Sequence, residues 1–168
     1  AYGNVGVMVN KIAKGFGMEV YAYDPFVPAD KMEKEGVIPV DSAEKLYETC
    51  NYISLHLPKI KETINSINYD LMSKLPKGAA IINTARKEVV CEESLKKIME
   101  ERDDFLYAAD VAPDCQDELK EKHGVRVSFT AKKMGAQTAE ANVNAGLAAI
   151  NQIIDYFENG NTTFQVNK

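Results

Sequence analysis

The first six residues have the types and the spacing of a phosphate-binding turn. They read Ala1-Tyr2-Gly3-Asn4-Val5-Gly6, which is the pattern Gly-x-Gly-x-x-Gly with alanine in place of its first glycine. Gly3 would let the backbone approach a pyrophosphate, and Gly6 would let the following helix lie close to a sheet. The N-terminus of that helix would attract the anion. The turn therefore predicts a dinucleotide site.

An acidic residue at a matching distance supports this interpretation. Asp24 ends a β-rich run 18 residues after Gly6, close to the offset of about 20 residues at which a carboxylate binds the ribose of a dinucleotide. The same residues could instead form a plain glycine turn and a loop aspartate, because such motifs also occur by chance.

A candidate substrate-binding cation follows a later apolar run. Arg86 comes soon after residues 79–82, which read as a buried strand. Open α/β sheets bind ligands at the carboxyl edge of their strands, and a planar guanidinium there can hold a carboxylate with two parallel hydrogen bonds. The alternative is a surface arginine at a strand end.

The elements that must position these residues alternate along the chain. Short β-rich runs and longer helical patterns follow one another, which predicts βα units around a parallel sheet. Strands are expected at residues 18–23, 37–40, 53–57, 79–82 and 105–109. Helices are expected at residues 5–16, 31–34, 42–48 and 92–101, with two more beginning after Asn68 and Thr138.

The helix after Thr138 is expected to be the longest. Thr138 suits its N-cap and Gly160 suits its end. Its apolar stripe consists of Val143, Leu147, Ile150, Ile154 and Phe157. A helix of this length must pack on something large.

The glycine turn requires a strand before it, but no residue precedes Ala1. We therefore expect the chain to be the C-terminal part of a longer one that contributes the first strand.

Composition argues against several classes of partner. The formal net charge of -5 and the pI of about 5.1 disfavour nucleic acid or an anionic membrane surface. No apolar run approaches the ~18 residues that span a bilayer, and the N-terminus does not resemble a signal peptide.

The cysteines, Cys50, Cys91 and Cys115, are odd in number and widely spaced, so we expect free thiols in a reducing cytoplasm. Neither of the two histidines has metal-binding spacing, so no metal site is expected.

Several segments together resemble the D-2-hydroxyacid dehydrogenase family, and in particular its 3-phosphoglycerate dehydrogenases. Besides the opening turn they are Tyr23-Asp24-Pro25, Ser54-Leu55-His56-Leu57-Pro58 with Thr63, Asn83-Thr84-Ala85-Arg86, Asp110-Val111 and Gly135-Ala136-Gln137-Thr138. The resemblance implies an α/β Rossmann-like doubly wound parallel sheet, NAD as cofactor and a homodimer. Residues 1–137 would form the NAD-binding domain without its first strand, and residues 138–168 a helix and tail returning to a largely absent substrate domain.

The resemblance also implies roles for individual residues. Arg86 would hold the substrate carboxylate, and Lys133 would stand at the position of the family's catalytic histidine, as in a subgroup of phosphoglycerate dehydrogenases. The residues expected at the cofactor are Gly3, Asn4, Val5, Gly6, Asp24, His56, Pro58, Thr84, Ala85, Asp110, Gly135 and Ala136. Asn4 and Val5 would donate backbone hydrogen bonds to the pyrophosphate. Asp110 would accept one from the nicotinamide amide.

A lysine can act as the acid/base only if its pKa falls from about 10.4 toward neutrality. Lys132 and Arg86 are positive charges that would lower the pKa of Lys133 if they lie nearby. The carboxylate that accompanies the family's histidine could be Asp114, Asp117 or Glu118 here, and a lysine base could work without one.

The resemblance to the 3-phosphoglycerate dehydrogenases implies NAD-dependent oxidation of 3-phosphoglycerate to 3-phosphohydroxypyruvate, the entry step of serine biosynthesis. One alternative is a dehydrogenase for another 2-hydroxy acid, such as lactate or glycerate. The other is a catalytically inactive NAD-binding interaction module, in which the pair Lys132-Lys133 is merely solvated.

Overall fold

A computed structural model describes the chain at residues 1–131 and 138–167. The chain divides into two compact units, Ala1–Ala131 and Lys132–Lys168, and each is described by itself below. The residues expected to bind the cofactor before position 131 all lie in the first unit.

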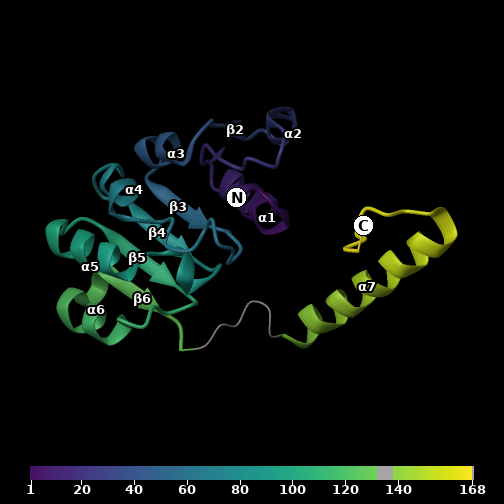
Figure 1. Ribbon diagram of the computed structural model, residues 1–168. Helices are drawn as coiled ribbons and strands as arrows, with labels where there is room; N and C mark the ends of the chain where they lie inside the picture. The colour runs from purple at the N-terminus through teal and green to yellow at the C-terminus, as the bar shows by residue number, and fades with distance from the viewer. Residues whose placement is uncertain (132–137, 168) are drawn as a thin grey trace. The chain divides into compact units, whose positions relative to one another are not determined.

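The first unit contains two parallel sheets. The larger one has the strand order β3-β4-β5-β6 and consists of β3 (Tyr52–Leu55), β4 (Ala80–Asn83), β5 (Leu106–Ala109) and β6 (Val127–Phe129). The smaller one pairs β1 (Tyr21–Ala22) with β2 (Ile38–Pro39). The predicted parallel α/β architecture is confirmed (Figure 1).

One helix precedes β1, and the other helices of this unit connect successive strands. They are α1 (Asn4–Gly15), α2 (Ala29–Lys34), α3 (Ala43–Thr49), α4 (Tyr69–Ser73), α5 (Glu92–Glu101) and α6 (Gln116–His123), with short 3-10 turns η1 (Lys87–Val89) and η2 (Gly124–Arg126). Two of them begin at the expected caps, because Ser42 accepts from the N–H of Lys45 and Asn68 accepts from the N–H of Leu71. Helix α6 and strand β6 were not expected. Helix α6 buries only Leu119, so the sequence offers almost no apolar periodicity there.

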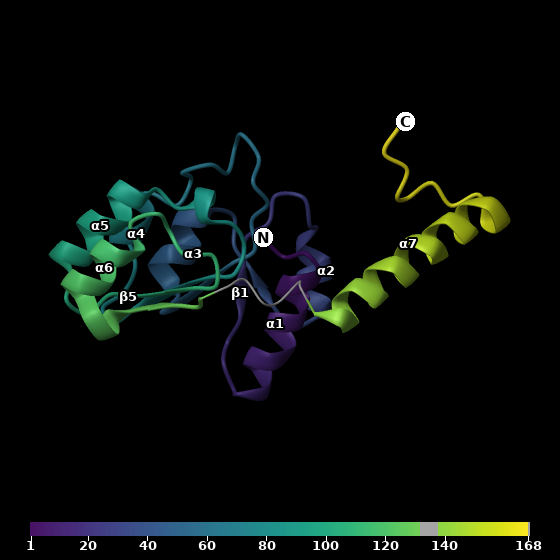
Figure 2. The same ribbon diagram turned by 90° about the horizontal axis from the view of Figure 1, so that it is seen from below.

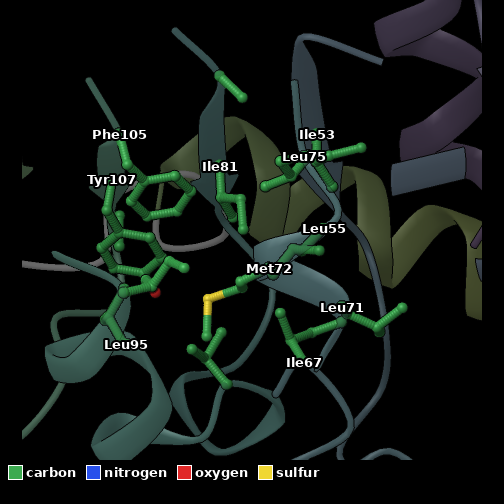
Figure 3. Packing of buried hydrophobic residues seen from close by; sticks show 14 of the residues in the cluster. Ile53, Leu55, Ile67, Leu71, Met72, Leu75, Ile81, Leu95, Phe105 and Tyr107 are labelled. Carbon is green, nitrogen blue, oxygen red and sulfur yellow. The ribbon is translucent and has the colours of Figure 1, made fainter. Parts of the chain in front are cut away.

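One face of the larger sheet carries the core. Figure 2 shows α3, α4, α5 and α6 gathered on one side of the strands. The fully buried side chains between these helices and the sheet include Met72, Ile81, Leu95, Phe105 and Tyr107, several of which Figure 3 shows packed together. Residues of the opposite face are more open, as for Tyr52 and Leu106, which are 59% and 42% exposed.

A groove of about 820 Å³ lies between strands β1 and β3, and helix α1 contributes to its wall. Within the described residues, no strand pairing joins the two sheets. Asn10 lines the groove and is 2% exposed, and its Oδ1 has no hydrogen-bond donor in the described part of the chain. In a Rossmann sheet of order 3-2-1-4-5-6, the first strand lies between the second and the fourth. The expected strand before the glycine turn stays a prediction, and this groove is where it would fit.

The second unit is dominated by α7 (Ala139–Asn159). Thr138 caps it by accepting from the N–H of Ala141, and Gly160 ends it with a φ of 67°, as expected from the sequence. Its apolar stripe is exposed within this unit, with Val143 and Phe157 at 59% and 79%. That the helix packs on a substrate domain stays a prediction. Among the described residues, no helix combines the length and the apolar character needed to cross a bilayer.

Candidate active site

The carboxyl ends of three neighbouring strands lie side by side in the larger sheet. Leu55, Asn83 and Ala109, the last residues of β3, β4 and β5, are paired in register. The residues that directly follow these strands therefore share one edge of the sheet, the edge at which parallel α/β sheets bind ligands. His56, Arg86 and Asp110 all follow these strands.

The glycine turn leads into α1 as predicted. Gly3 is the N-cap residue, and no side chain caps the first turn of the helix. The first N–H groups of a helix have no intrahelical acceptor, so Asn4 and Val5 present backbone donors at an exposed, positively polarised helix end. A Cβ added to Gly3 would meet nothing within 4 Å, which means that the surface over the turn is open to a ligand.

Gly6 allows the close contact expected of it. A Cβ at this position would lie 3.0 Å from the carbonyl oxygen of Ala1 and 3.7 Å from Cδ2 of His56. The first distance is tighter than most Cβ contacts, so with alanine the carbonyl of Ala1 would have to shift by a few tenths of an ångström. Gly6 therefore brings the start of α1 against the residue that follows β3.

Asp24 lies beside the same turn. One of its carboxylate oxygens accepts from the N–H of Tyr2 at 2.7 Å, and the other accepts from the N–H of Phe26 at 2.9 Å. These bonds fix the carboxylate next to Gly3, and each oxygen retains a second lone pair for a ribose hydroxyl.

His56 has the environment of a packing residue. Its Nε2 lies 3.0 Å from Oγ of Ser54, and the side chain is half-buried. Burial lowers the pKa of His56. The ring is therefore neutral near pH 7. Pro58, two residues later, is exposed in the loop after β3.

The turn after β4 carries the candidate carboxylate-binding residue. Thr84 and Arg86 are exposed, whereas Ala85 between them is buried. The guanidinium of Arg86 donates to the carbonyl of Ala85 through Nη1 at 2.8 Å. Among the described residues the guanidinium makes no other hydrogen bond, so most of its five donors remain available to an anion.

Asp110 follows β5, and one of its oxygens lacks a partner. Its N–H donates to the carbonyl of Asn83 at 3.3 Å. Its Oδ1 is buried and has no hydrogen-bond donor among residues 1–131 and 138–167. A buried acceptor without a donor is costly, and the amide N–H of a nicotinamide would satisfy it. Together with the open Gly3 turn, this orphan oxygen shows that the residues present fit NAD.

Asp114 is the candidate carboxylate that reaches the turn carrying Arg86. It forms an ion pair with Lys87 at 2.5 Å, and Glu92 accepts from the backbone N–H groups of Asp114 and Cys115. Glu118 instead pairs with Lys122 on the surface of α6, and Asp117 is exposed.

Cys115 is a protonated thiol under ordinary conditions. Burial, and next its hydrogen bond to Glu92, raise the pKa of the thiol to about 12. A thiol is a poor nucleophile, so this residue offers no acid/base or covalent chemistry to the site.

Three expected site residues, Lys133, Gly135 and Ala136, lie outside the described residues, and their roles stay predictions. In the part of the chain that the structure describes, no group of three or more His, Cys, Asp or Glu side chains could hold a metal ion.

Asn83 and Tyr107, which are hydrogen-bonded beneath the turn that carries Arg86, were not predicted as site residues from the sequence. Asn83 is fully buried, and its side chain holds both Ala85 and Arg86. In the sequence, Asn83 could have been recognised as an amide at the end of an otherwise apolar strand. An amide buried there without hydrogen bonds would be costly, so it must have partners. Tyr107 gives no such signal, because a tyrosine in a strand reads as ordinary core.

Comparisons with known proteins identify the family to which this chain is similar. Residues 1–132 match the family model described as D-isomer specific 2-hydroxyacid dehydrogenase, NAD binding domain. The D-3-phosphoglycerate dehydrogenase of Synechocystis sp. is 34% identical over 156 residues, which cover 91% of this chain and 27% of that protein. The hydroxypyruvate reductase of Thermotoga maritima is 31% identical over 157 residues, which cover 90% of this chain and 49% of that protein.

A solved structure matches over the whole chain. It is the NAD+-bound 3-phosphoglycerate dehydrogenase of Entamoeba histolytica, with a TM-score of 0.85 and 46% identity, and the match covers 100% of this chain and 53% of that one. The chain therefore spans between about a quarter and about a half of the length of these relatives.

Proposed function

Because the chain belongs to the D-isomer specific 2-hydroxyacid dehydrogenases and contains their NAD-binding domain, we propose that it is the cofactor-binding part of an NAD-dependent 3-phosphoglycerate dehydrogenase. The enzyme oxidises the secondary alcohol of 3-phosphoglycerate to the ketone of 3-phosphohydroxypyruvate, the entry step of serine biosynthesis. The alcohol carbon loses a hydride, and the hydroxyl loses a proton. NAD, when bound, is the hydride acceptor.

The observation that carries this proposal is the common sheet edge after β4 and β5. Within residues 1–131 and 138–167, most guanidinium donors of Arg86 have no acceptor, and Oδ1 of Asp110, which lies after the next strand, has no donor. A carboxylate bound by Arg86 and a nicotinamide amide bound by Asp110 would place the acid and the cofactor ring on neighbouring strands. Such positioning provides a large part of the rate enhancement of a two-substrate reaction.

The proton of the hydroxyl needs an acceptor as the C–H bond breaks, since a protonated ketone is too high in energy. We assign this role to Lys133, whose amine must be neutral to accept the proton. Cationic neighbours such as Lys132 would lower the pKa of Lys133 toward the working pH.

The choice of 3-phosphoglycerate is supported by the names of the relatives from Synechocystis and Entamoeba histolytica. A second candidate is a dehydrogenase for glycerate or another 2-hydroxy acid. The relative from Thermotoga maritima, which is called a hydroxypyruvate reductase, favours it.

Turnover by the full-length protein separates these candidates. We expect NADH formation, followed at 340 nm, to be fastest with D-3-phosphoglycerate in a panel that includes D-glycerate and D-lactate. The variant Lys133→Ala should lose at least about 100-fold in kcat, the usual contribution of a general base. Faster turnover of D-glycerate would favour the second candidate. NAD binding without turnover of any acid would contradict both and indicate an inactive module.

We also propose that the enzyme is a cytoplasmic homodimer. The three cysteines are free and half-buried, as suits a reducing compartment. Light scattering of the full-length protein would test the dimer, and fractionation would test the location.

A further inference from the structure

A chain of buried hydrogen bonds connects Tyr107 on β5 to the turn that carries Arg86. Asn83 is 0% exposed and Tyr107 is 2% exposed. The amide Nδ2 of Asn83 donates to the carbonyl of Arg86 at 3.0 Å and to the hydroxyl of Tyr107 at 3.3 Å. Its Oδ1 accepts from the N–H of Ala85 at 3.0 Å. Both amide hydrogens and the amide oxygen of Asn83 are therefore engaged.

These bonds set the shape of the turn. The side chain of Asn83 is hydrogen-bonded to the backbone N–H of Ala85 and to the backbone carbonyl of Arg86. The backbone carbonyl of Asn83 accepts from the N–H of Asp110. The same residue thus ties the proposed carboxylate-binding turn to the proposed nicotinamide-binding strand end. Because these groups are buried, an unpaired N–H of Asn83 would be costly.

Tyr107 is well placed to hold this amide in one orientation. Its ring packs in the core among Phe105 and Leu95 (Figure 3), and it lies 6.0 Å from the ring of Phe129. Burial raises the pKa of Tyr107 to about 12, so the phenol keeps its proton at any working pH. A rigid ring and a neutral hydroxyl give the amide hydrogen of Asn83 a fixed acceptor.

We propose that Tyr107 is a positioning residue that orients Arg86 through Asn83. Tyr107 does not touch the substrate in this arrangement. It fixes the rotation of the Asn83 amide, and the amide fixes the backbone from which the guanidinium extends. The inference about the orientation of Arg86 stands on the geometry alone. Its effect on the acid substrate rests on the proposed function.

The chain provides a matched control. Tyr47 is also 2% exposed and belongs to the same core, but its hydroxyl has no hydrogen-bond partner in the described part of the chain. The variants Tyr107→Phe and Tyr47→Phe each remove one buried phenol oxygen. Only the first removes an acceptor from Asn83.

The first experiment observes Arg86 directly, without substrate, in the full-length protein. The side-chain Nε–Hε signals of its arginines, among them Arg86, Arg102 and Arg126, are recorded by NMR at about pH 6. Arg86→Lys assigns the signal of Arg86. We expect Tyr107→Phe to shift or broaden the Arg86 signal while those of Arg102 and Arg126 stay, and Tyr47→Phe to leave all three unchanged. An unchanged Arg86 signal in Tyr107→Phe would overturn the proposal.

The second experiment measures kinetics in the full-length protein. Tyr107→Phe should raise the KM of the 2-hydroxy acid about fivefold, as for one lost neutral hydrogen bond, and leave the Kd of NAD within about twofold. Tyr47→Phe should change neither value. Equal changes in KM and in the Kd of NAD, or equal effects of the two variants, would show a general structural role and contradict the positioning role. If no acid is turned over by the unchanged protein but the Arg86 signal responds as expected, the proposed function fails and the positioning role is supported.

Discussion

At the scale of single residues, Arg86 differs from the other arginines of the chain. The guanidinium groups of Arg102 and Arg126 donate to backbone carbonyls and form ion pairs with aspartates. Arg86 is exposed, and in the part of the chain that the structure describes its guanidinium donates to the carbonyl of its neighbour Ala85 and to no other group. A cation held at a sheet edge with free donors suits ligand binding better than a structural role.

Replacing Arg86 should therefore separate the two ligands. In Arg86→Ala we expect the KM of the acid to rise about 100-fold, since charge-assisted hydrogen bonds contribute about 1.5–3 kcal/mol. The Kd of NAD, measured by NADH fluorescence, should stay within about twofold. A comparable loss of NAD affinity would contradict the position assigned to Arg86.

Asp24 should determine which nicotinamide cofactor binds. Its carboxylate is held beside the glycine turn by the N–H groups of Tyr2 and Phe26, and a negative charge there repels a 2′-phosphate. We expect the protein to prefer NAD over NADP at least about tenfold, and Asp24→Ser to reduce that preference. The ratio of the two kcat/KM values measures it, and a native preference for NADP would show the assignment to be wrong.

At the scale of elements, an ion pair within the turn before β5, between Arg102 and Asp104, forms hydrogen bonds to the turn before β4. Asp104 accepts from Nη2 of Arg102 at 2.6 Å and from the N–H of Gly78 at 2.6 Å. Arg102 also donates to the carbonyls of Leu75 and Pro76. The hydrogen bond from Arg102, followed by that from Gly78, holds the pKa of Asp104 well below its ordinary value. The two turns that start the central strands are thereby linked.

The stability that Asp104 provides should depend on pH in a defined direction. A carboxyl group with a lowered folded pKa stabilises the fold above its unfolded pKa of about 3.9, and this contribution is lost as the pH falls through the folded pKa. We expect Asp104→Asn to lower the free energy of unfolding by about 1 kcal/mol at pH 7, with the difference shrinking below about pH 4.

Urea denaturation at pH 7 and pH 3 measures this effect. The neighbouring variant Asp103→Asn is a suitable control. The Asp103 side chain is 100% exposed, so this variant should change the free energy of unfolding little. A difference between Asp104→Asn and the unchanged protein that stays constant down to pH 3 would argue against the ion pair.

At the scale of the whole molecule, a groove between β1 and β3 separates the edges of the two sheets of the first unit. Asn10 lines this groove, and its buried Oδ1 has no hydrogen-bond donor in the described part of the chain. Unpaired strand edges readily accept another extended segment. We expect an extended segment to occupy this groove in the working enzyme.

A fusion tests this expectation. A seven-residue Val- and Ile-rich extension joined before Ala1 should slow amide hydrogen exchange in β1 and β3 about tenfold or more, because paired amides exchange only after opening. A Gly- and Ser-rich extension of the same length should have no such effect. Equal exchange with both extensions would show that the groove does not bind a strand.

Much of this organisation could be predicted from the sequence, because it depends on local physical chemistry. The spacing of Gly3 and Gly6, the caps Ser42, Asn68 and Thr138, and the apolar runs of the central strands each act over a few residues. Those signals were sufficient for the parallel α/β fold and for placing Arg86 and Asp110 after strands. Where apolar periodicity is weak, as in α6, the prediction failed.

The tertiary structure alone decided which of these residues act together. The register of β3, β4 and β5 places Arg86 and Asp110 at one edge, and the hydrogen bond between Asn83 and Tyr107 spans 24 residues of sequence. The orphan oxygen of Asp110 and the buried amide of Asn83 depend on which groups surround them after folding. Hydrogen-bond satisfaction is a property of that surrounding space, whereas sequence spacing carries information only along the chain.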